Sequence, residues 1–238
     1  MAQHGKKYVE AAKLVDRNKE YTPQEAVALI KKTAYTKFAG TVELHMKMGV
    51  DVKQADQIVR GVTLMPHGTG KTVRILVFAE GDGERIAKEA GADVFGADDL
   101  IKQIEGGFLD FDVAVAGPQM MAKVGRLGKI LGTRGLMPSP KAGTIVPPDQ
   151  LPRLIKELRM GRVEFRTDKT GNIHTIVGKA SFTEEQLFEN LTSMLDAIMR
   201  AKPTAAKGIY IKKIVVASTM GPGIRLNVNE ATNAHAAA

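Results

Sequence analysis

The sequence predicts a two-domain protein with α/β and α+β parts, in which a discontinuous α+β domain from both chain ends holds an inserted Rossmann-like parallel-sheet α/β domain. Near both ends, apolar and polar residues alternate, which is typical of strands with one wet face. The middle carries nearly continuous apolar strands separated by helices, which is typical of a parallel sheet covered on both faces. Neither outer piece is large enough to bury a full core alone. We therefore expect one domain from 1–67 plus 160–238 and a second from 68–159.

The first outer piece begins its regular structure at Thr22, which together with Pro23 and Glu25 forms the start signal of a helix. The segment Thr41 to Val50 then alternates cleanly between apolar and polar side chains, so it is the clearest strand of the chain. A second strand is expected from Ile58 to Met65.

The middle piece follows a strand–helix rhythm that predicts a small, doubly wound parallel sheet. Buried strands are expected at Val73–Ala79 and Asp112–Gly117, with a short strand at Asp93–Phe95 between them. Helices are expected after each strand, and their predicted starts are Glu84, Leu100 (capped by Asp98 and Asp99), Pro118 and Pro148.

The last piece returns to the wet-faced pattern. We expect Val163–Asp168 and Ile173–Lys179 to pair as a hairpin around the turn at 169–172. A second capping box at Thr183 starts a long helix, which Pro203 ends. Two further strands are expected, at Gly208–Thr219 and Ile224–Val228. The tail after Asn229 is expected to be loose.

Charge and composition narrow the function classes. The chain has 34 Lys and Arg against 26 Asp and Glu, a net charge of +8, and nearly all of the excess lies in the outer pieces. This sign favours a nucleic-acid partner, and the low aromatic content (5%) favours folded RNA or DNA over unpaired strands. Apolar stretches are too short to cross a bilayer and no secretory signal is visible, so we expect a cytoplasmic protein without a membrane partner.

Metal, redox and nucleotide chemistry are not expected. The chain has no cysteine, and its five histidines show neither a zinc-binding spacing nor a close pair. The segment 68–72 (GTGKT) lacks the first glycine of a phosphate loop and precedes a strand rather than a helix. Gly81 and Gly83 lack the third glycine of a dinucleotide fingerprint and neighbour two acids. We expect no cofactor, no small-molecule substrate and no enzyme, although a nucleotide-dependent enzyme and a DNA-binding regulator remain the competing classes.

A basic run from Lys123 to Ala142 stands out in the middle piece because it combines glycines with cations and contains no acid. Such a run suits a polyanion, although a solvated basic loop is equally consistent. We treat it as a possible secondary contact to tRNA or RNA, with a structural hinge loop as the alternative; its cations are Lys123, Arg126, Lys129, Arg134 and Lys141.

Motifs along nearly the whole chain, Gly5 to Val228, resemble the family of large ribosomal subunit protein one in its bacterial form, the family of the mobile stalk beside the tRNA exit site. The matching strings are HGKKY, TKFAGTVELH, DQIVRGVTLMPHGTGK, GADDLIKQI, FDVAVAGPQMM, LGTRGLMPSPKAGT, EFRTDKTGNIH and STMGPGIRLN. The resemblance implies a monomer within the large subunit that binds stalk rRNA. It also implies a role in movement and release of deacylated tRNA from the exit site, and translational repression of its own operon through the mRNA.

The resemblance places the main rRNA and mRNA surface on the domain that the two chain ends form. Carried over by motif, the binding residues would be Lys37, Phe38, Thr41, Arg166, Lys169, His174, Ser218, Thr219, Met220 and Gly221. Phe38 and Met220 would pack against ribose, Thr41, Thr219 and the Gly221 amide would contact 2′-hydroxyls, and the cations would hold phosphates.

Overall fold

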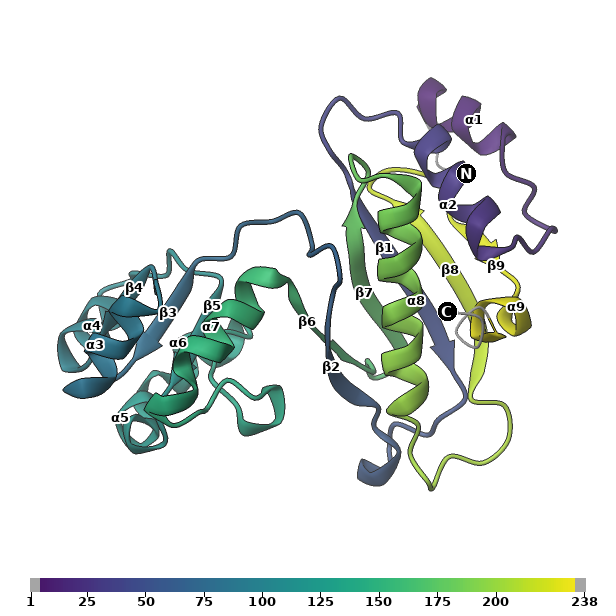
Figure 1. The fold of residues 1–238 in the computed structure, drawn as a ribbon. Coiled ribbons are helices and arrows are strands. Elements are labelled where there is room, and N and C mark those ends of the chain that lie inside the picture. Colours follow the sequence, from purple (N-terminus) through teal and green to yellow (C-terminus); the bar gives the residue numbers. More distant parts are fainter. Residues whose placement is uncertain (1–4, 234–238) are drawn as a thin grey trace. The chain divides into compact units, whose positions relative to one another are not determined.

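The computed structural model describes residues 5–233 and divides the chain into two compact units (Figure 1). Unit 1 joins the two chain ends, up to Gly70 and from Gly161 onward, and unit 2 runs from Lys71 to Met160. Each unit has its own buried clusters. The predicted fold class is confirmed, because unit 1 is an α+β unit with antiparallel pairing and unit 2 contains a parallel sheet.

A four-stranded antiparallel sheet forms the body of unit 1. Its order is β7–β1–β8–β9, in which the strands span Asn172–Lys179, Thr41–Met48, Ile211–Ser218 and Ile224–Leu226. The alternation expected in β1 is confirmed, because its inward side chains are buried while the others face away from the core. The outward row on β1 is Thr41, Glu43, His45 and Lys47.

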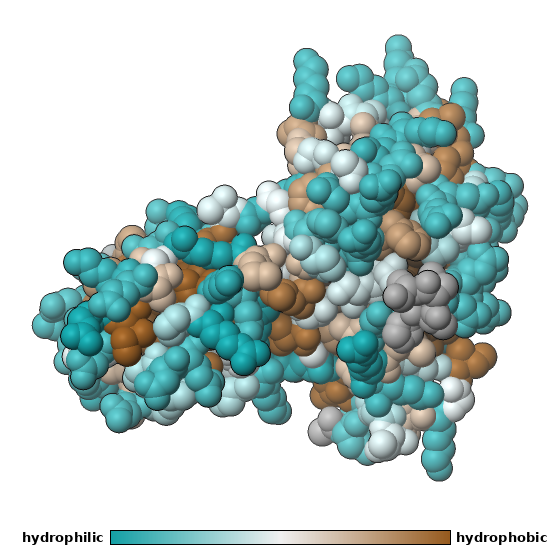
Figure 2. Space-filling view, viewed as in Figure 1, coloured by the Kyte–Doolittle hydropathy of each residue, from teal (hydrophilic) through white to brown (hydrophobic). Residues whose placement is uncertain are grey.

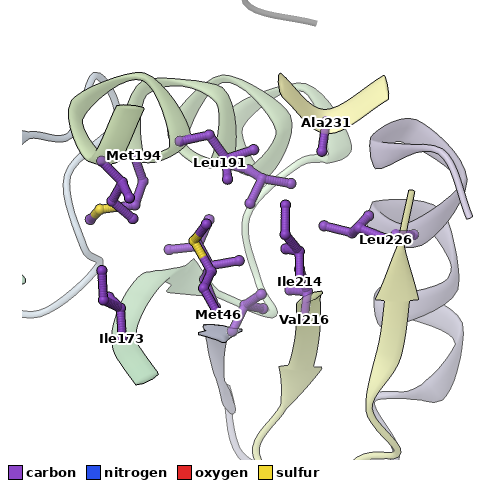
Figure 3. Packing of buried hydrophobic residues seen from close by; sticks show 14 of the residues in the cluster. Met46, Ile173, Leu191, Met194, Ile214, Val216, Leu226 and Ala231 are labelled. Carbon is purple, nitrogen blue, oxygen red and sulfur yellow. The ribbon is translucent and has the colours of Figure 1, made fainter. Parts of the chain in front are cut away.

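Helices cover one face of this sheet. The long helix α8 (Glu184–Arg200) lies over it with α2 (Pro23–Thr33), and side chains from Met46, Ile214 and Val216 point toward Leu191 and Met194 of α8 (Figure 3). Both predicted capping boxes are present, at Thr22 and Thr183. The other face of the sheet carries the wet row, so it is the face left for a partner.

Two features of unit 1 differ from the expectation at the chain ends. The segment after Asn229 is not loose throughout, because helix α9 (Val228–Asn233) packs Ala231 into the core, fully buried. The remaining tail, 234–238, lies outside the described residues. Helix α1 (Lys6–Lys13) precedes α2 and had no counterpart in the sequence-based prediction.

The expected hairpin between the strands flanking residues 169–172 is wrong. Strand β6 (Arg162–Arg166) pairs with β2 (Arg60–Leu64) in a separate two-stranded ribbon, whereas β7 pairs with β1. One isolated bridge, Thr167 to Ile173, is all that joins the two segments as strands within residues 5–233. The chain does reverse there, but the Asp168 carboxylate accepts the turn amides, so no ladder is needed to hold the reversal.

Unit 2 is a three-stranded parallel sheet of order β4–β3–β5, whose strands span Val94–Gly96, Ile75–Phe78 and Val113–Ala116. One buried cluster packs on each face of this sheet, as the nearly continuous apolar strands predicted. The helices are α3 (Asp82–Glu89), α4 (Asp98–Glu105), α5 (Met121–Val124), α6 (Gly128–Thr133) and α7 (Leu151–Met160). Short 3-10 turns lie at Ala55–Gln57 in unit 1 and at Pro118–Met120, Gly125–Leu127, Pro140–Ala142 and Pro148–Gln150 in unit 2.

Two local predictions in unit 2 need correction. Asp98 and Asp99 lie inside the first turn of α4, after Ala97 at the N-cap, so they act on the helix dipole rather than as side-chain caps. The helix expected from Pro118 is broken into short 3-10 and α pieces up to Thr133. Gly125 and Gly128 are part of this helical run, and the apolar side chains of the run, Val124, Leu127 and Leu131, are buried in one of the two clusters.

The chain leaves unit 1 and returns to it at adjacent points. A Cβ on Gly161 would lie 2.5 Å from Gly68 Cα, so the two backbones are in direct contact. Asn190 of α8, fully buried, holds this point, because its Nδ2 donates to the carbonyls of Gly68 (3.0 Å) and Val177 (2.8 Å). Its Oδ1 accepts the amide of His67 at 3.1 Å.

Candidate RNA-binding surface

The structure separates the ten residues expected in the main site into two groups at different ends of the unit 1 sheet. Thr41 begins β1 opposite Lys179, and its neighbour Val42 pairs with Ser218. Lys47 lies near the other end of β1, opposite Asn172. Six residues of strand separate these points, about 20 Å. The start group comprises Lys37, Phe38, Thr41, Ser218, Thr219, Met220 and Gly221, and the end group comprises Arg166, Lys169 and His174.

The start group is held together by hydrogen bonds between the first residue of β1 and the turn after β8. The amide of Thr219 donates to the Thr41 carbonyl at 2.8 Å, and the Thr219 hydroxyl accepts the Thr41 amide at 2.8 Å. The Thr41 hydroxyl in turn accepts Lys179 Nζ at 2.8 Å. The two segments, 178 residues apart, therefore form one local surface.

Two large apolar side chains project from this surface. Phe38 is 59% exposed and Met220 is 68% exposed, so neither belongs to the core. Met220 has a φ of 66°, which is uncommon for a side chain of this kind. Tyr35 holds this conformation, because its hydroxyl donates to the Met220 carbonyl at 2.7 Å. Tyr35 was missed by the sequence analysis, since nothing local connects it to a residue 185 positions away.

Gly221 and Ser218 form the floor of the turn. A Cβ at position 221 would lie 2.2 Å from Ser218 Oγ, so any other residue there would displace the Ser218 hydroxyl. The Gly221 amide donates to the Ser218 carbonyl at 2.8 Å. Ser218 Oγ is buried and has no hydrogen-bond partner in the described part of the chain.

These contacts change the chemistry expected of three groups. The Thr219 hydroxyl and the Gly221 amide are already engaged within the protein, so they shape the surface rather than reach outward. The Thr41 hydroxyl accepts from Lys179 and keeps its own proton for a donor role. What the start group offers to a ligand is thus the apolar pair Phe38 and Met220 beside the exposed ammonium of Lys37.

The end group is organised by the Asp168 turn. The Asp168 carboxylate accepts the amides of Thr170 (2.9 Å) and Asn172 (2.7 Å) and the Thr170 hydroxyl. These hydrogen bonds, that from the Asn172 amide most of all, hold the pKa of Asp168 far below its ordinary value. The turn exposes Lys169, and Arg166 is exposed on β6, so both cations are available for phosphates.

His174 of the end group lies directly against His45, which the sequence analysis did not single out. The two residues are cross-strand partners, and their Nδ1 atoms are 2.9 Å apart with the rings edge to face. The fold therefore brings together two histidines that are far apart in the sequence. The pair joins residues 129 positions apart, which no spacing rule in the sequence detects.

The basic run in unit 2 is not one continuous loop, since it is helical up to Thr133. Lys123 is engaged, because its ammonium contacts the carboxylates of Glu80 and Asp98, and these contacts raise its pKa, Glu80 most strongly. The remaining four cations are exposed and have no carboxylate partner between residues 5 and 233; they are Arg126, Lys129, Arg134 and Lys141.

The glycine motifs that resemble nucleotide sites have structural roles. Residues 68–72 form an irregular connection between β2 and β3, without a following helix. Gly81 has a φ of 59° and precedes α3, which accounts for a glycine at that turn. Within the described residues there is no group of three or more histidine, cysteine or carboxylate side chains that could hold a metal ion.

The surface chemistry favours a polar partner. Hydrophilic residues cover most of the face in Figure 2, and hydrophobic residues appear there in small separate groups. None of the helices between residues 5 and 233 combines the length and the apolar composition needed to cross a lipid bilayer.

The fold and this surface are those of a non-enzymatic, RNA-binding protein. A sequence model of the ribosomal protein L1p/L10e family matches residues 30–222, and the chain belongs to this family. It is therefore a ribosomal protein with a structural rather than a catalytic role, which rules out the enzyme reading.

Curated relatives agree over almost the full length. The chain is 58% identical over 228 residues to large ribosomal subunit protein uL1 of Dehalococcoides mccartyi, covering 96% of each chain. It is 56% identical to the protein of that name from Thermomicrobium roseum, covering 96% of this chain and 95% of the relative. For the Lactobacillus delbrueckii subsp. bulgaricus protein the identity is 53%, covering 95% and 97%.

Proposed function

We propose that this ribosomal protein is a structural constituent of the large subunit in the cytoplasm, and that it binds large-subunit rRNA at the mobile stalk as a monomer through unit 1. The observation that carries the proposal is the start group, where Lys37 and Phe38 on the segment before β1 and Met220 on the turn after β8 are exposed, and hydrogen bonds join the two segments. A preformed apolar pair flanked by a cation suits ribose faces and phosphates of a folded RNA. The end group adds Arg166 and Lys169 for phosphates about 20 Å away.

A role at the exit site and a role in regulation belong to the same proposal. The protein assists movement and release of deacylated tRNA, and it represses translation of its own operon by binding an mRNA structure that imitates the rRNA site. The mRNA role is supported by the shape of the surface, since a surface that binds the rRNA site also fits an mRNA segment of the same shape. A DNA-binding regulator is the competing class, and competition between RNA and DNA of equal length separates the two.

Removing unit 2 tests where rRNA binds. Because Gly68 and Gly161 are in contact, a variant that replaces Lys71–Met160 by two or three glycines closes unit 1 without stretching the chain. We expect this variant to fold and to bind the stalk rRNA fragment within about threefold of the full chain, in a filter-binding titration. A folded variant, judged by circular dichroism, that no longer binds the fragment would remove unit 1 as the main site.

The second prediction is that the basic run from Lys123 to Ala142 on unit 2 contacts tRNA. Reversing three unpartnered cations, Arg126→Glu, Lys129→Glu and Arg134→Glu, should weaken retention of exit-site tRNA about tenfold or more, because fixed cations hold phosphates. Binding of the stalk rRNA fragment should stay unchanged. The matched control reverses Lys88, Lys102 and Lys156, which are exposed cations of unit 2 outside the run. Equal tRNA retention by the two variants would return the run to a purely structural role.

A further inference from the structure

The open face of the unit 1 sheet contains a cationic hollow centred on the His45–His174 pair. This cavity of about 220 Å³ is lined by residues of three neighbouring strands: His45, Met46, Lys47, Asn172, His174, Lys213 and Val215. Lys213 lies opposite Lys47 on β8, is exposed, and has no partner in the described part of the chain. The Lys47 ammonium donates to the Thr170 carbonyl at the rim.

The contacts of the His45 and His174 rings determine how many protons the two rings can hold. His45 Nε2 lies 3.6 Å from Glu43 Oε2, and His174 Nε2 lies 3.6 Å from Asp168 Oδ2, while the two Nδ1 atoms face each other at 2.9 Å. One nitrogen of the Nδ1 pair must donate and the other must accept. With one excess proton, both Nε2–H groups point to carboxylates and a single hydrogen lies between the Nδ1 atoms.

A second excess proton places two N–H donors face to face, which the 2.9 Å contact does not tolerate. An anion relieves this conflict once the two rings have turned apart, because its oxygens can then accept from both Nδ1–H groups. The carboxylates of Glu43 and Asp168 keep the opposite nitrogens occupied, and Lys213 adds a free cation at the same hollow. The arrangement therefore fits an oxyanion that arrives together with a proton.

We propose that His45, His174 and Lys213 form a subsite for a backbone phosphate of the bound RNA, and that binding of this phosphate takes up a proton. The inference rests on the proposed function, which it deepens, since it extends the end group from His174 across the open face to His45 and Lys213. His45 is four residues along β1 from Thr41, about 13 Å, so one RNA strand that contacts the start group can reach it.

The charges around the pair set the direction of the pH effect. Burial lowers the pKa of His45 from 6.5, the charge of His174 lowers it further, and Glu43 opposes the change. The neutral form of His45 is thus favoured in the free protein, and a phosphate oxygen that accepts a hydrogen bond from the protonated ring raises its pKa again. Since the bound state holds more protons than the free state, affinity for RNA rises as the pH falls.

The experiment is a set of binding titrations of the full chain with the stalk rRNA fragment from pH 8 to pH 6. Uptake of one proton predicts up to about a tenfold gain in affinity per pH unit below the bound-state pKa. The variant His45→Gln should bind with an affinity that does not change with pH. The variant Lys213→Gln should bind more weakly at every pH while keeping the slope.

The matched control is His67→Gln, another unit 1 histidine whose Nε2 contacts a carboxylate, that of Glu189, at 2.6 Å. Its pH dependence should equal that of the wild type. If His45→Gln keeps the wild-type pH dependence, or if the wild type binds equally at all pH values, the phosphate subsite is overturned while rRNA binding by unit 1 stands. If the wild type binds the fragment at no pH, the proposed function fails as well.

Discussion

Met220→Asp should lower the affinity of the protein for the stalk rRNA fragment more than a hundredfold, about 3 kcal/mol. Met220 is 68% exposed at the tip of the β8–β9 turn, next to the cation-bearing loop with Phe38. In the proposed complex its side chain packs against the RNA, so a carboxylate there would lose the apolar contact, have to be desolvated and repel phosphates. A filter-binding titration measures the loss directly.

The substitution should leave the fold intact. The φ of 66° at position 220 is better tolerated by aspartate than by methionine, and the Tyr35 hydrogen bond uses the backbone carbonyl of the residue. The matched control is Ile209→Asp, which places the same charge on an unrelated apolar side chain of unit 1 that is 73% exposed. Wild-type affinity of Met220→Asp, or an equal loss in both variants, would remove Met220 from the binding surface.

The parts of the fold that the sequence predicted correctly depend on neighbouring residues. The capping boxes at Thr22 and Thr183 use residues three positions apart, and both are present. The alternation in β1 follows from the two-residue period of a strand, and the expected side chains of β1 are buried. All the residues that make up such a signal lie within one helical turn or a few positions, so it can be recognised without knowing which distant segment packs against it.

The errors concern partners that are distant in sequence. Pairing of β6 with β2 depends on a match across about 100 residues, whereas the nearest strand in sequence, β7, finds a longer partner in β1. Lys123 resembled a free cation because Glu80 lies 43 positions away. For the same reason the hydrogen bond between Tyr35 and Met220 and the histidine pair were invisible, although they organise the candidate surface.

Asn190→Ala should cost about 3 kcal/mol of the free energy of unfolding of unit 1. The side chain makes three hydrogen bonds, to the Gly68 carbonyl, the Val177 carbonyl and the His67 amide, and it is fully buried. A net contribution of about 1 kcal/mol for each bond gives this value, and partners left unsatisfied in the interior add to it. Urea denaturation followed by circular dichroism measures the change as a lower midpoint with an unaltered slope.

The control for this prediction is Thr192→Ala, two residues further along α8. Its hydroxyl donates to the Phe188 carbonyl within the same helix, so its loss breaks no contact between segments and should cost less than about 1 kcal/mol. The comparison isolates what Asn190 does, which is to tie α8 and β7 to the point where the chain leaves for unit 2. If both variants are equally stable, the pairing of Gly68 with Gly161 and the β2–β6 ribbon hold that point without the asparagine.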